Sequence, residues 1–171
     1  LSMKTDGYEA DKNDIKVISD GVTYNLTSDW DETVLSYMWA NDGKSIYFTA
    51  ATDGTIQLFE VNFSGFSGKK SIVSQLTKGD WDINVIVGQS GDHLVLTRVS
   101  MNRAAELYTF HTKTKTWKQI TDVNKSIYNT VGKSRTERRF VTTSDNKQML
   151  VWVVYPPDFD PNKKYPALLY C

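Results

Sequence analysis

Short apolar stretches alternate with turn residues along the first two thirds of the chain. Each stretch is rich in β-branched and aromatic residues, and clusters of Asn, Asp, Gly and Ser separate one stretch from the next. This pattern is typical of short strands joined by tight turns, and no segment shows convincing helical periodicity. The order of hydrophobic and polar positions therefore predicts an all-β fold.

The same strand pattern occurs twice, about 50 residues apart. Asp29-Trp30-Asp31 recurs as Asp80-Trp81-Asp82, and NDGKSIYFTA at 41–50 recurs as QSGDHLVLTR at 89–98. The further matches are LFEV at 58–61 with LYTF at 107–110, and strand ends at Thr27, Thr77 and Thr121. A unit of about 40 to 50 residues with four short strands is the pattern of a β-propeller blade, whose sheet must stack on neighbours to bury both faces.

The predicted strands form about two and a half four-stranded blades, whereas closed propellers have about four to eight. The first complete blade is expected at 34–40, 45–51, 57–63 and 70–77, the second at 83–89, 93–100, 106–112 and 117–122, and the outer half of an earlier blade at 14–19 and 22–27. Tight hairpin turns are expected at 41–44 and 90–92, where Gly supplies the positive φ.

The last part of the chain has a different pattern, since all four prolines lie between 156 and 166. Two strands, 137–145 and 148–157, are joined by a polar turn, and an apolar third strand follows at 165–171. A continuous apolar run suits a parallel strand that is buried on both faces. We therefore expect propeller blades over 1–125, a linker over 126–136, and the start of a second domain over 137–171.

Composition excludes several classes of function. The chain has 20 Lys and Arg against 20 Asp and Glu, so it carries no net charge that would attract nucleic acid. Its longest apolar run, at 149–155, is far shorter than the roughly 20 residues of a membrane helix, and its single cysteine gives neither a disulfide nor a zinc-ligand spacing. We expect no nucleic-acid partner, no membrane span and no cofactor or metal. These features do not indicate a cellular compartment.

Four segments resemble the prolyl oligopeptidase family of serine peptidases, especially its dipeptidyl peptidase IV and acylaminoacyl peptidase branches. They are GYEADKNDI at 7–15, WANDGKSIYFTA at 39–50, AELYTF at 105–110 and FVTTSDNKQMLVWVVYPPDFDPNKKYPALLY at 140–170. The last is the most specific, because in the family such a segment leads from the propeller into an α/β-hydrolase domain. The chain departs from the family at Ala40-Asn41, where Ser-Pro is usual, and at Thr5-Asp6, where Arg-Pro is usual.

The resemblance implies a serine exopeptidase or oligopeptidase whose propeller limits access to short peptides. In an α/β-hydrolase the triad runs Ser, Asp or Glu, His, with Ser on a G-x-S-x-G elbow and an oxyanion donor after strand three. If 165–171 is that strand, the oxyanion loop and triad follow it. GQSGD at 88–92 and FSGFSGK at 63–69 both fail to match the elbow. We therefore expect no catalytic, cofactor-binding or metal residue here, and an inactive fragment.

The alternative is a non-catalytic propeller module that binds or scaffolds other proteins. The two readings differ in what the gene encodes after Cys171: a hydrolase domain in the first, a stop in the second. In either case, blades with open apolar faces and an unpaired strand at Tyr165 to Cys171 are expected to self-associate.

Several groups could carry chemistry, but a structural role is favoured for each. The Asp-Trp-Asp motifs at 29–31 and 80–82 could bind a metal, yet their repeat positions favour a turn role. His93 and His111 have no Ser or Cys constellation nearby in sequence, which favours structural histidines. The basic segment 133–139 could be a docking patch, but its place at the junction favours a solvated linker.

The same weighing applies to aromatic residues and to single motifs. Cys171 has no visible base and is expected to be a small buried hydrophobe. Asn25-Leu26-Thr27 and Asn62-Phe63-Ser64 match glycosylation acceptors, which matter only in a secreted eukaryotic protein. Four tryptophans could line a peptide channel or pack between blades, and packing is favoured: Trp30, Trp39, Trp81 and Trp117.

Overall fold

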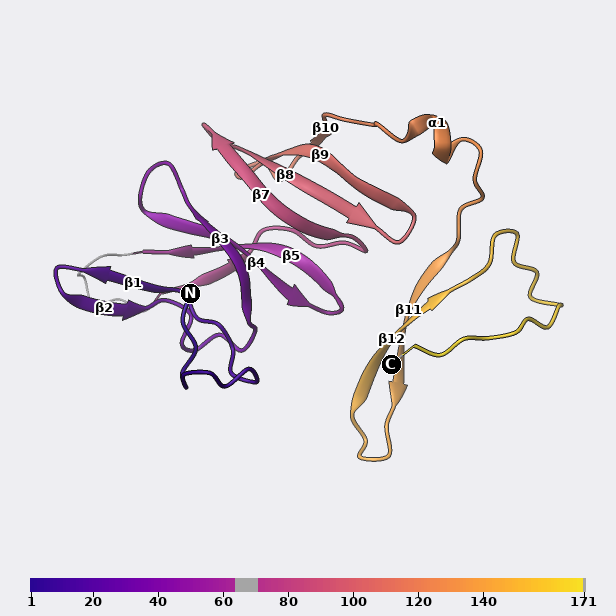
Figure 1. The fold of residues 1–171 in the computed structure, drawn as a ribbon, viewed down its shortest axis with the longest axis horizontal. Helices are drawn as coiled ribbons and strands as arrows, with labels where there is room; N and C mark the ends of the chain where they lie inside the picture. The colour runs from indigo at the N-terminus through magenta and orange to yellow at the C-terminus, as the bar shows by residue number, and fades with distance from the viewer. Residues whose placement is uncertain (64–70, 171) are drawn as a thin grey trace. The chain divides into compact units, whose positions relative to one another are not determined.

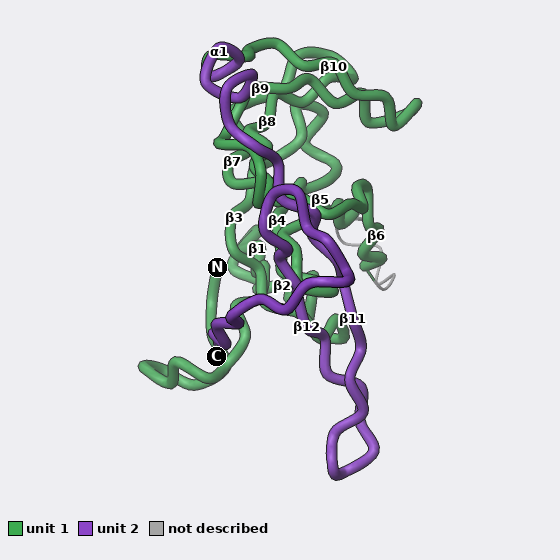
Figure 2. Tube along the Cα trace, turned by 90° about the vertical axis from the view of Figure 1, so that its right-hand side faces the viewer, with its two compact units in different colours: residues 1–123 green, residues 124–171 purple. Residues whose placement is uncertain are grey.

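The computed structural model describes residues 1–63 and 71–170. The chain divides into two compact units, Leu1–Val123 and Asn124–Cys171 (Figure 2). The elements of the first unit are β1 (Lys16–Ser19), β2 (Val22–Asn25), β3 (Val34–Trp39), β4 (Ser45–Thr52), β5 (Thr55–Asn62), β6 (Val73–Gln75), β7 (Asp82–Ser90), β8 (His93–Ser100), β9 (Arg103–His111) and β10 (Trp117–Gln119). The second unit contains α1 (Lys125–Tyr128), β11 (Thr136–Thr142) and β12 (Gln148–Val154).

The first four-stranded sheet is antiparallel, with its strands in chain order β3-β4-β5-β6. Its turns form where the sequence supplies residues that tolerate positive φ: Gly43 has φ +66°, and Asp53 and Gly54 have φ +49° and +73°. Residues 45–50 of β4 are buried without interruption, so the middle of this sheet is covered on both faces.

The second four-stranded sheet repeats this order as β7-β8-β9-β10. Gly91, with φ +55°, makes the turn between β7 and β8. Register shifts interrupt the β7–β8 and β8–β9 ladders. Val85 and Val87 of β7 are each more than half exposed, whereas Leu94 and Leu96 of β8 are fully buried. This sheet is therefore packed on one face and open on the other.

Two apolar clusters join the sheets of the first unit, which follow one another in chain order in Figure 1. In one cluster, Ile15 and Leu26 beside the β1–β2 hairpin pack with Ile46 and Phe48 of β4. In the other, Tyr47 of β4 and its sheet pack against the second sheet. Successive side chains of a strand point to opposite faces, so β4 contributes to both clusters.

Three threonines at equivalent places close the outer strands of the repeat. In each case the threonine Oγ1 accepts an N–H from the neighbouring strand and donates to a buried side chain. Thr27 accepts from Ile15 (3.0 Å) and donates to Asp14; Thr77 accepts from Leu58 (2.9 Å) and donates to Gln57; Thr121 accepts from Leu107 (2.9 Å) and donates to Glu106. The sequence indicated these threonines as strand ends, and their hydrogen bonds give the physical reason.

The partners of the threonines also hold the segment that follows each outer strand. The Gln57 side chain donates from Nε2 to the carbonyl oxygens of Trp81 (2.7 Å) and Gly79 (3.2 Å). Glu106 Oε1 accepts the N–H of Val123 at 2.9 Å. Beside Asp14, Lys12 Nζ donates to the carbonyls of Thr27 (2.7 Å), Ser28 (3.3 Å) and Trp30. Each threonine is thus part of a larger clamp on the connection between sheets.

The second unit contains the β11–β12 hairpin, paired from Thr136↔Val154 to Thr142↔Gln148. Its turn lies at the predicted place, with Asn146 at φ +61°. The predicted third strand at 165–171 is not formed in its described part, 165–170. A strand exists only through hydrogen bonds to a neighbour, and these residues have no such pairing. Cys171 lies outside the described residues.

The strand predictions for the two sheets, the β1–β2 hairpin and the β11–β12 hairpin are otherwise confirmed to within a few residues at each end. The one-turn helix α1 was not predicted, since four residues are too few to show a helical period. Among the described residues, no helix is long and apolar enough to cross a membrane.

We expect the substitution Thr77→Val to destabilise the protein by about 1 to 3 kcal/mol, because it leaves the buried N–H of Leu58 and the Gln57 amide oxygen without a partner. Thr77→Ser, which keeps the hydroxyl, should cost less. Urea unfolding followed by tryptophan fluorescence measures both. Thr23→Val, at an exposed position of β2, is the matched control, and an equal loss in the control and in Thr77→Val would contradict the role of the hydroxyl.

Candidate functional site

The two histidines lie opposite each other where the β8–β9 ladder ends. His93 begins β8, His111 ends β9, and their ring centroids are 4.6 Å apart in an edge arrangement. His111 Nδ1 accepts the N–H groups of Lys113 (3.3 Å) and Thr114 (3.4 Å). A nitrogen that accepts two backbone donors is not available to take a proton from a nucleophile. The geometry fits the structural role that the sequence favours.

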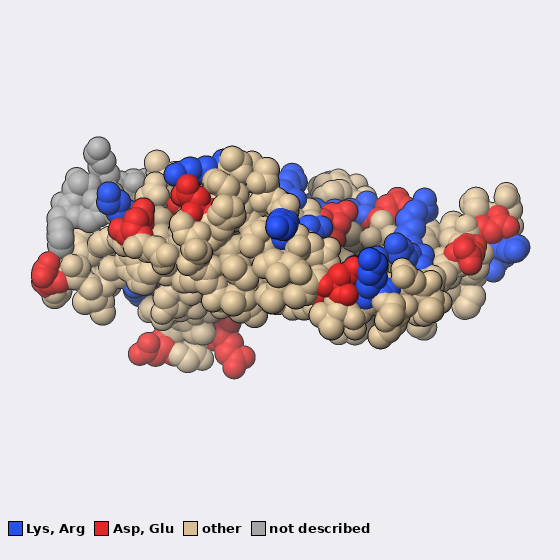
Figure 3. Space-filling view, turned by 90° about the horizontal axis from the view of Figure 1, so that it is seen from above, with Lys and Arg blue, Asp and Glu red and all other residues tan. Residues whose placement is uncertain are grey.

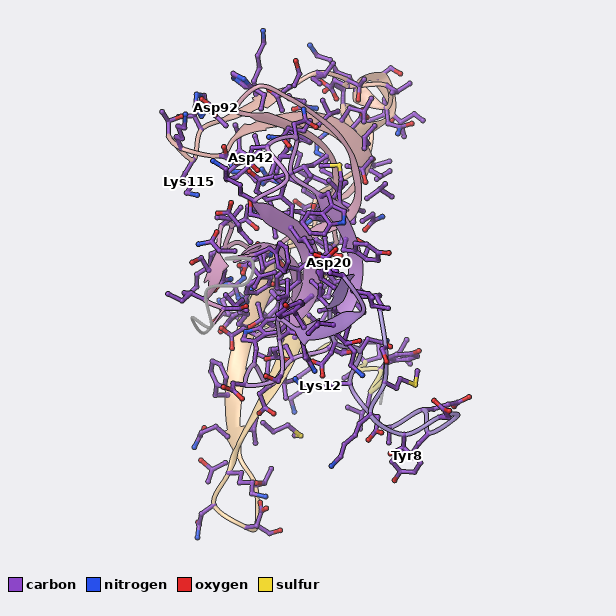
Figure 4. All side chains as sticks on the ribbon, turned by 90° about the vertical axis from the view of Figure 1, so that its left-hand side faces the viewer. Tyr8, Lys12, Asp20, Asp42, Asp92 and Lys115 are labelled. Carbon is purple, nitrogen blue, oxygen red and sulfur yellow. The ribbon has the colours of Figure 1, made fainter. Side chains whose placement is uncertain are left out.

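Charged groups gather at the same end of the sheets, where Figure 4 labels Asp42, Asp92 and Lys115. Lys113 Nζ lies 2.8 Å from Asp92 Oδ2, and this hydrogen bond lowers the pKa of the exposed Asp92 carboxyl. Burial, and then the charge of Glu60, raise the pKa of Tyr47. Local pairing and burial explain both pKa shifts. The shifts do not indicate a nucleophile placed beside a base.

The two Asp-Trp-Asp motifs differ in what their carboxylates contact. Asp82 Oδ1 accepts the N–H of Ile56 at 2.7 Å and so ties β7 to β5 of the preceding sheet. Asp31, its counterpart in the first motif, is exposed. In the described part of the chain, no three His, Cys, Asp or Glu side chains are grouped so as to hold a metal ion. The contact of Asp82 agrees with a role in the connection between strands.

The tryptophans of the two motifs pack against the sheets, as the sequence favours. Trp30 meets the rings of Phe48 and Phe59 at centroid distances of 5.2 and 5.1 Å. Trp81 meets Trp117 at 5.1 Å, and the Arg98 guanidinium lies 4.2 Å from the Trp81 ring centroid. Burial among these rings lowers the pKa of Arg98. The fourth candidate, Trp39 of β3, is 41% exposed.

The basic segment 133–139 is more ordered than a solvated linker. Arg138 and Arg139 belong to β11, and the guanidinium of Arg138 lies 4.9 Å from the ring centroid of Trp152. The guanidinium of Arg135 lies 4.0 Å from the ring centroid of Tyr155. Figure 3 shows Lys and Arg beside Asp and Glu on the visible face, not gathered into one basic patch. Residues 136–139 of the segment therefore belong to the hairpin, and cation–π contacts join Arg135 and Arg138 to aromatic rings.

The remaining sequence candidates contribute little to a site. Asn25 Nδ2 donates to Asp14 Oδ2 at 2.8 Å, so the amide of the first glycosylation motif is already in use. Ser64 of the second motif and Cys171 lie outside the described residues. One cavity of about 270 Å³ is lined by Lys133, Arg135, Pro156, Asp158, Phe159 and Pro161, and another of about 200 Å³ lies between β1 and β3.

Two stacked four-stranded antiparallel sheets in chain order, preceded by half of a third, define the first unit as consecutive blades of a β-propeller. We call β3–β6 the first blade, β7–β10 the second blade and β1–β2 the half blade. No protein-family model matches the chain.

Known proteins are similar to this chain in sequence or in architecture. The chain is 35% identical over 173 residues to dipeptidyl-peptidase 5 of Porphyromonas gingivalis, a match that covers 100% of the chain and 24% of that protein. An acylaminoacyl peptidase structure from Pyrococcus horikoshii matches with a TM-score of 0.66 at 22% identity, over 91% of this chain and 22% of that one. The β-propeller domain of the trilobed protease from Pyrococcus furiosus matches with a TM-score of 0.50 at 19% identity, over 66% and 32%.

The likeness to dipeptidyl-peptidase 5 along the whole chain supports a fragment of a prolyl oligopeptidase-family protein. The chain spans about a quarter of the length of the Porphyromonas relative. The family and the partial propeller predicted from the sequence are thus confirmed.

Hydrogen bonding at the clamp of the half blade makes stability depend on pH. Burial alone would raise the pKa of Asp14, but hydrogen bonds from Lys12, Asn25 and Thr27 outweigh burial and hold the pKa below its ordinary value. A lowered pKa in the folded state stabilises the protein above the pKa of the unfolded chain, about 3.9. This contribution is lost as the pH falls through the lower, folded-state pKa.

We therefore expect Asp14→Asn to lower the free energy of unfolding at about pH 7 and to lower it much less at a pH below the folded-state pKa, where the wild-type carboxyl has lost its charge. Urea unfolding at both pH values measures the difference. Asp31→Asn, at an exposed position, should change stability little at either pH. An Asp14→Asn effect of the same size at both pH values would show that the carboxylate charge contributes nothing.

Proposed function

We propose that this chain is the part of a serine peptidase that joins the last propeller blades to the start of an α/β-hydrolase domain. The observation that carries the proposal is the 35% identity to a dipeptidyl-peptidase 5 along the whole chain, through both the blades and the segment after them. By this proposal the full-length protein removes dipeptides or acylated residues from the amino-terminal end of short peptides, and the propeller limits which peptides enter.

The domain division follows the sequence expectation. Residues 1–125 are assigned to the propeller, 126–136 to a linker, and 137–171 to the first strands of the hydrolase. The boundary between the compact units, after Val123, supports a division in this region. The strand at 165–171 would form when the hydrolase sheet supplies its neighbours, because an apolar strand of this kind is stable only between other strands.

The catalytic residues are assigned to the polypeptide outside these 171 residues. The sequence contains no G-x-S-x-G motif, and both of its histidines belong to paired strands of the second blade. The elbow, the acid and the catalytic histidine of an α/β-hydrolase all come after strand three. The chain by itself is therefore expected to be inactive.

We expect the full-length protein to hydrolyse chromogenic dipeptidyl or acylaminoacyl substrates and to be inactivated by a fluorophosphonate, while the 171-residue chain shows neither turnover nor labelling. Mutation of the G-x-S-x-G serine to alanine is the control for the full-length protein. Turnover by the short chain that the inhibitor abolishes would refute the assignment of the triad. A gene that ends directly after Cys171 would favour a non-catalytic binding module instead.

Self-association of the short chain follows from its open surfaces. Leu168, Leu169 and Tyr170 are almost fully exposed, and Val85 and Val87 lie on the open face of the second blade. Exposed apolar surfaces and unpaired strand edges favour association with other chains. Multi-angle light scattering should show species larger than a monomer, and Leu168→Lys with Leu169→Lys should reduce them. Asn162→Lys, which adds a charge elsewhere in the second unit, should not. A stable monomer at high concentration would contradict this expectation.

A further inference from the structure

Four side chains of the second unit form a continuous stack. The guanidinium of Arg135 lies 4.0 Å from the ring centroid of Tyr155, Tyr155 meets Phe159 at 4.6 Å, and Phe159 meets Tyr165 at 5.2 Å. Arg135 and Tyr155 are also joined by a backbone hydrogen bond of 2.9 Å, from the Tyr155 N–H to the Arg135 carbonyl. The stack therefore runs from the root of the β11–β12 hairpin to the first residue of the apolar tail.

The hairpin end of the stack is held by charged groups. Tyr155 is 8% exposed, and its hydroxyl donates to Glu137 Oε2 at 2.7 Å and accepts from Arg139. Arg139 Nε donates to Glu137 Oε1 at 3.0 Å. Hydrogen bonds from Arg139 and then from Tyr155 hold the pKa of Glu137 below its ordinary value. The Tyr155 ring is thus a fixed platform for Phe159.

The tail end of the stack is closed by a hydrogen bond. The Tyr165 hydroxyl accepts the N–H of Asp160 at 3.0 Å. Proline restricts φ at Pro156, Pro157 and Pro161, which further limits the segment between the two tyrosines. Residues 156–164 therefore form a loop whose two ends are joined by the same series of ring contacts.

We propose that Phe159 and Tyr165 are positioning residues for the peptidase reaction. This inference rests on the proposed function, in which residues 165–171 lead into the loop that supplies an oxyanion donor. Neither residue would touch the substrate. By fixing the start of the strand, the two rings would fix the place of the donor at its far end. A displacement of about 1 Å in such a group can cost about a hundredfold in rate.

The test uses the full-length protein and the substitution Phe159→Leu, which keeps an apolar side chain but removes the ring. We expect kcat to fall by about tenfold with KM changed by less than about twofold, since the donor acts on the transition state more than on the bound substrate. Phe159→Tyr, which keeps the ring, should leave kcat close to that of the unmodified protein. Phe140→Leu, the same change at a solvent-exposed position of β11, is the matched control and should leave both constants unchanged.

A second readout does not depend on activity. Amide hydrogen exchange of residues 167–170 in the full-length protein should become faster in Phe159→Leu and in Tyr165→Phe, which loses the acceptor for the Asp160 N–H, but not in Phe140→Leu. Unchanged kcat together with unchanged exchange in Phe159→Leu would overturn the proposal, and so would equal effects of Phe159→Leu and Phe140→Leu. If the unmodified protein hydrolyses no peptide, the proposed function fails, while the exchange experiment still decides whether the stack orders the tail.

Discussion

A threonine hydroxyl that accepts one hydrogen bond and donates another, just after each outer strand, is the constraint that the three repeats share. At the end of each outer strand, the residue before the threonine donates its N–H to one neighbour, and the threonine hydroxyl accepts the N–H of that same neighbour. In the first blade, Leu76 and Thr77 engage Leu58 in this way. A buried N–H left without an acceptor costs about 1 to 3 kcal/mol, so the strand must end where the hydroxyl is.

The side chain that accepts the hydrogen bond from each hydroxyl connects that hydroxyl to further groups. Gln57 also donates hydrogen bonds to carbonyl oxygens of the connection before β7. Glu106 also accepts the N–H of Val123 at the end of the first unit. In the half blade the link runs through Asp14 and Lys12. Glu106, Gln57 and the Asp14–Lys12 pair thus have equivalent roles. Each accepts a hydrogen bond from a threonine hydroxyl and still binds a second group.

This mixture of partners shows what sequence can and cannot predict. The strands were predictable because alternation and turn residues are local signals, and Thr27, Thr77 and Thr121 stood out because they recur. Asp14, Gln57 and Glu106 differ in chemistry and in distance from their threonines, so no pattern identified them. The contacts on Tyr155 could not be predicted from the sequence for a related reason. Arg135 and Tyr155 are 20 positions apart, and only the β11–β12 register brings them together. The tail at 165–170 was predicted as a strand from its apolar residues, but a strand also needs a neighbour to pair with.

The two units are therefore ordered by different forces. The first blade is covered on both faces, so apolar burial on either side holds its strands, and the second blade, with one open face, relies on its packed side and on the clamp at Glu106. Among the described residues of its unit, the β11–β12 hairpin has no second sheet to pack on, and Phe140, Met149 and Val154 remain about half exposed. A two-stranded hairpin alone is marginally stable in water. Cation–π and ring contacts join the root of the hairpin to Phe159 and Tyr165. Beyond Tyr165, residues 166–170 pair with no strand among the described residues.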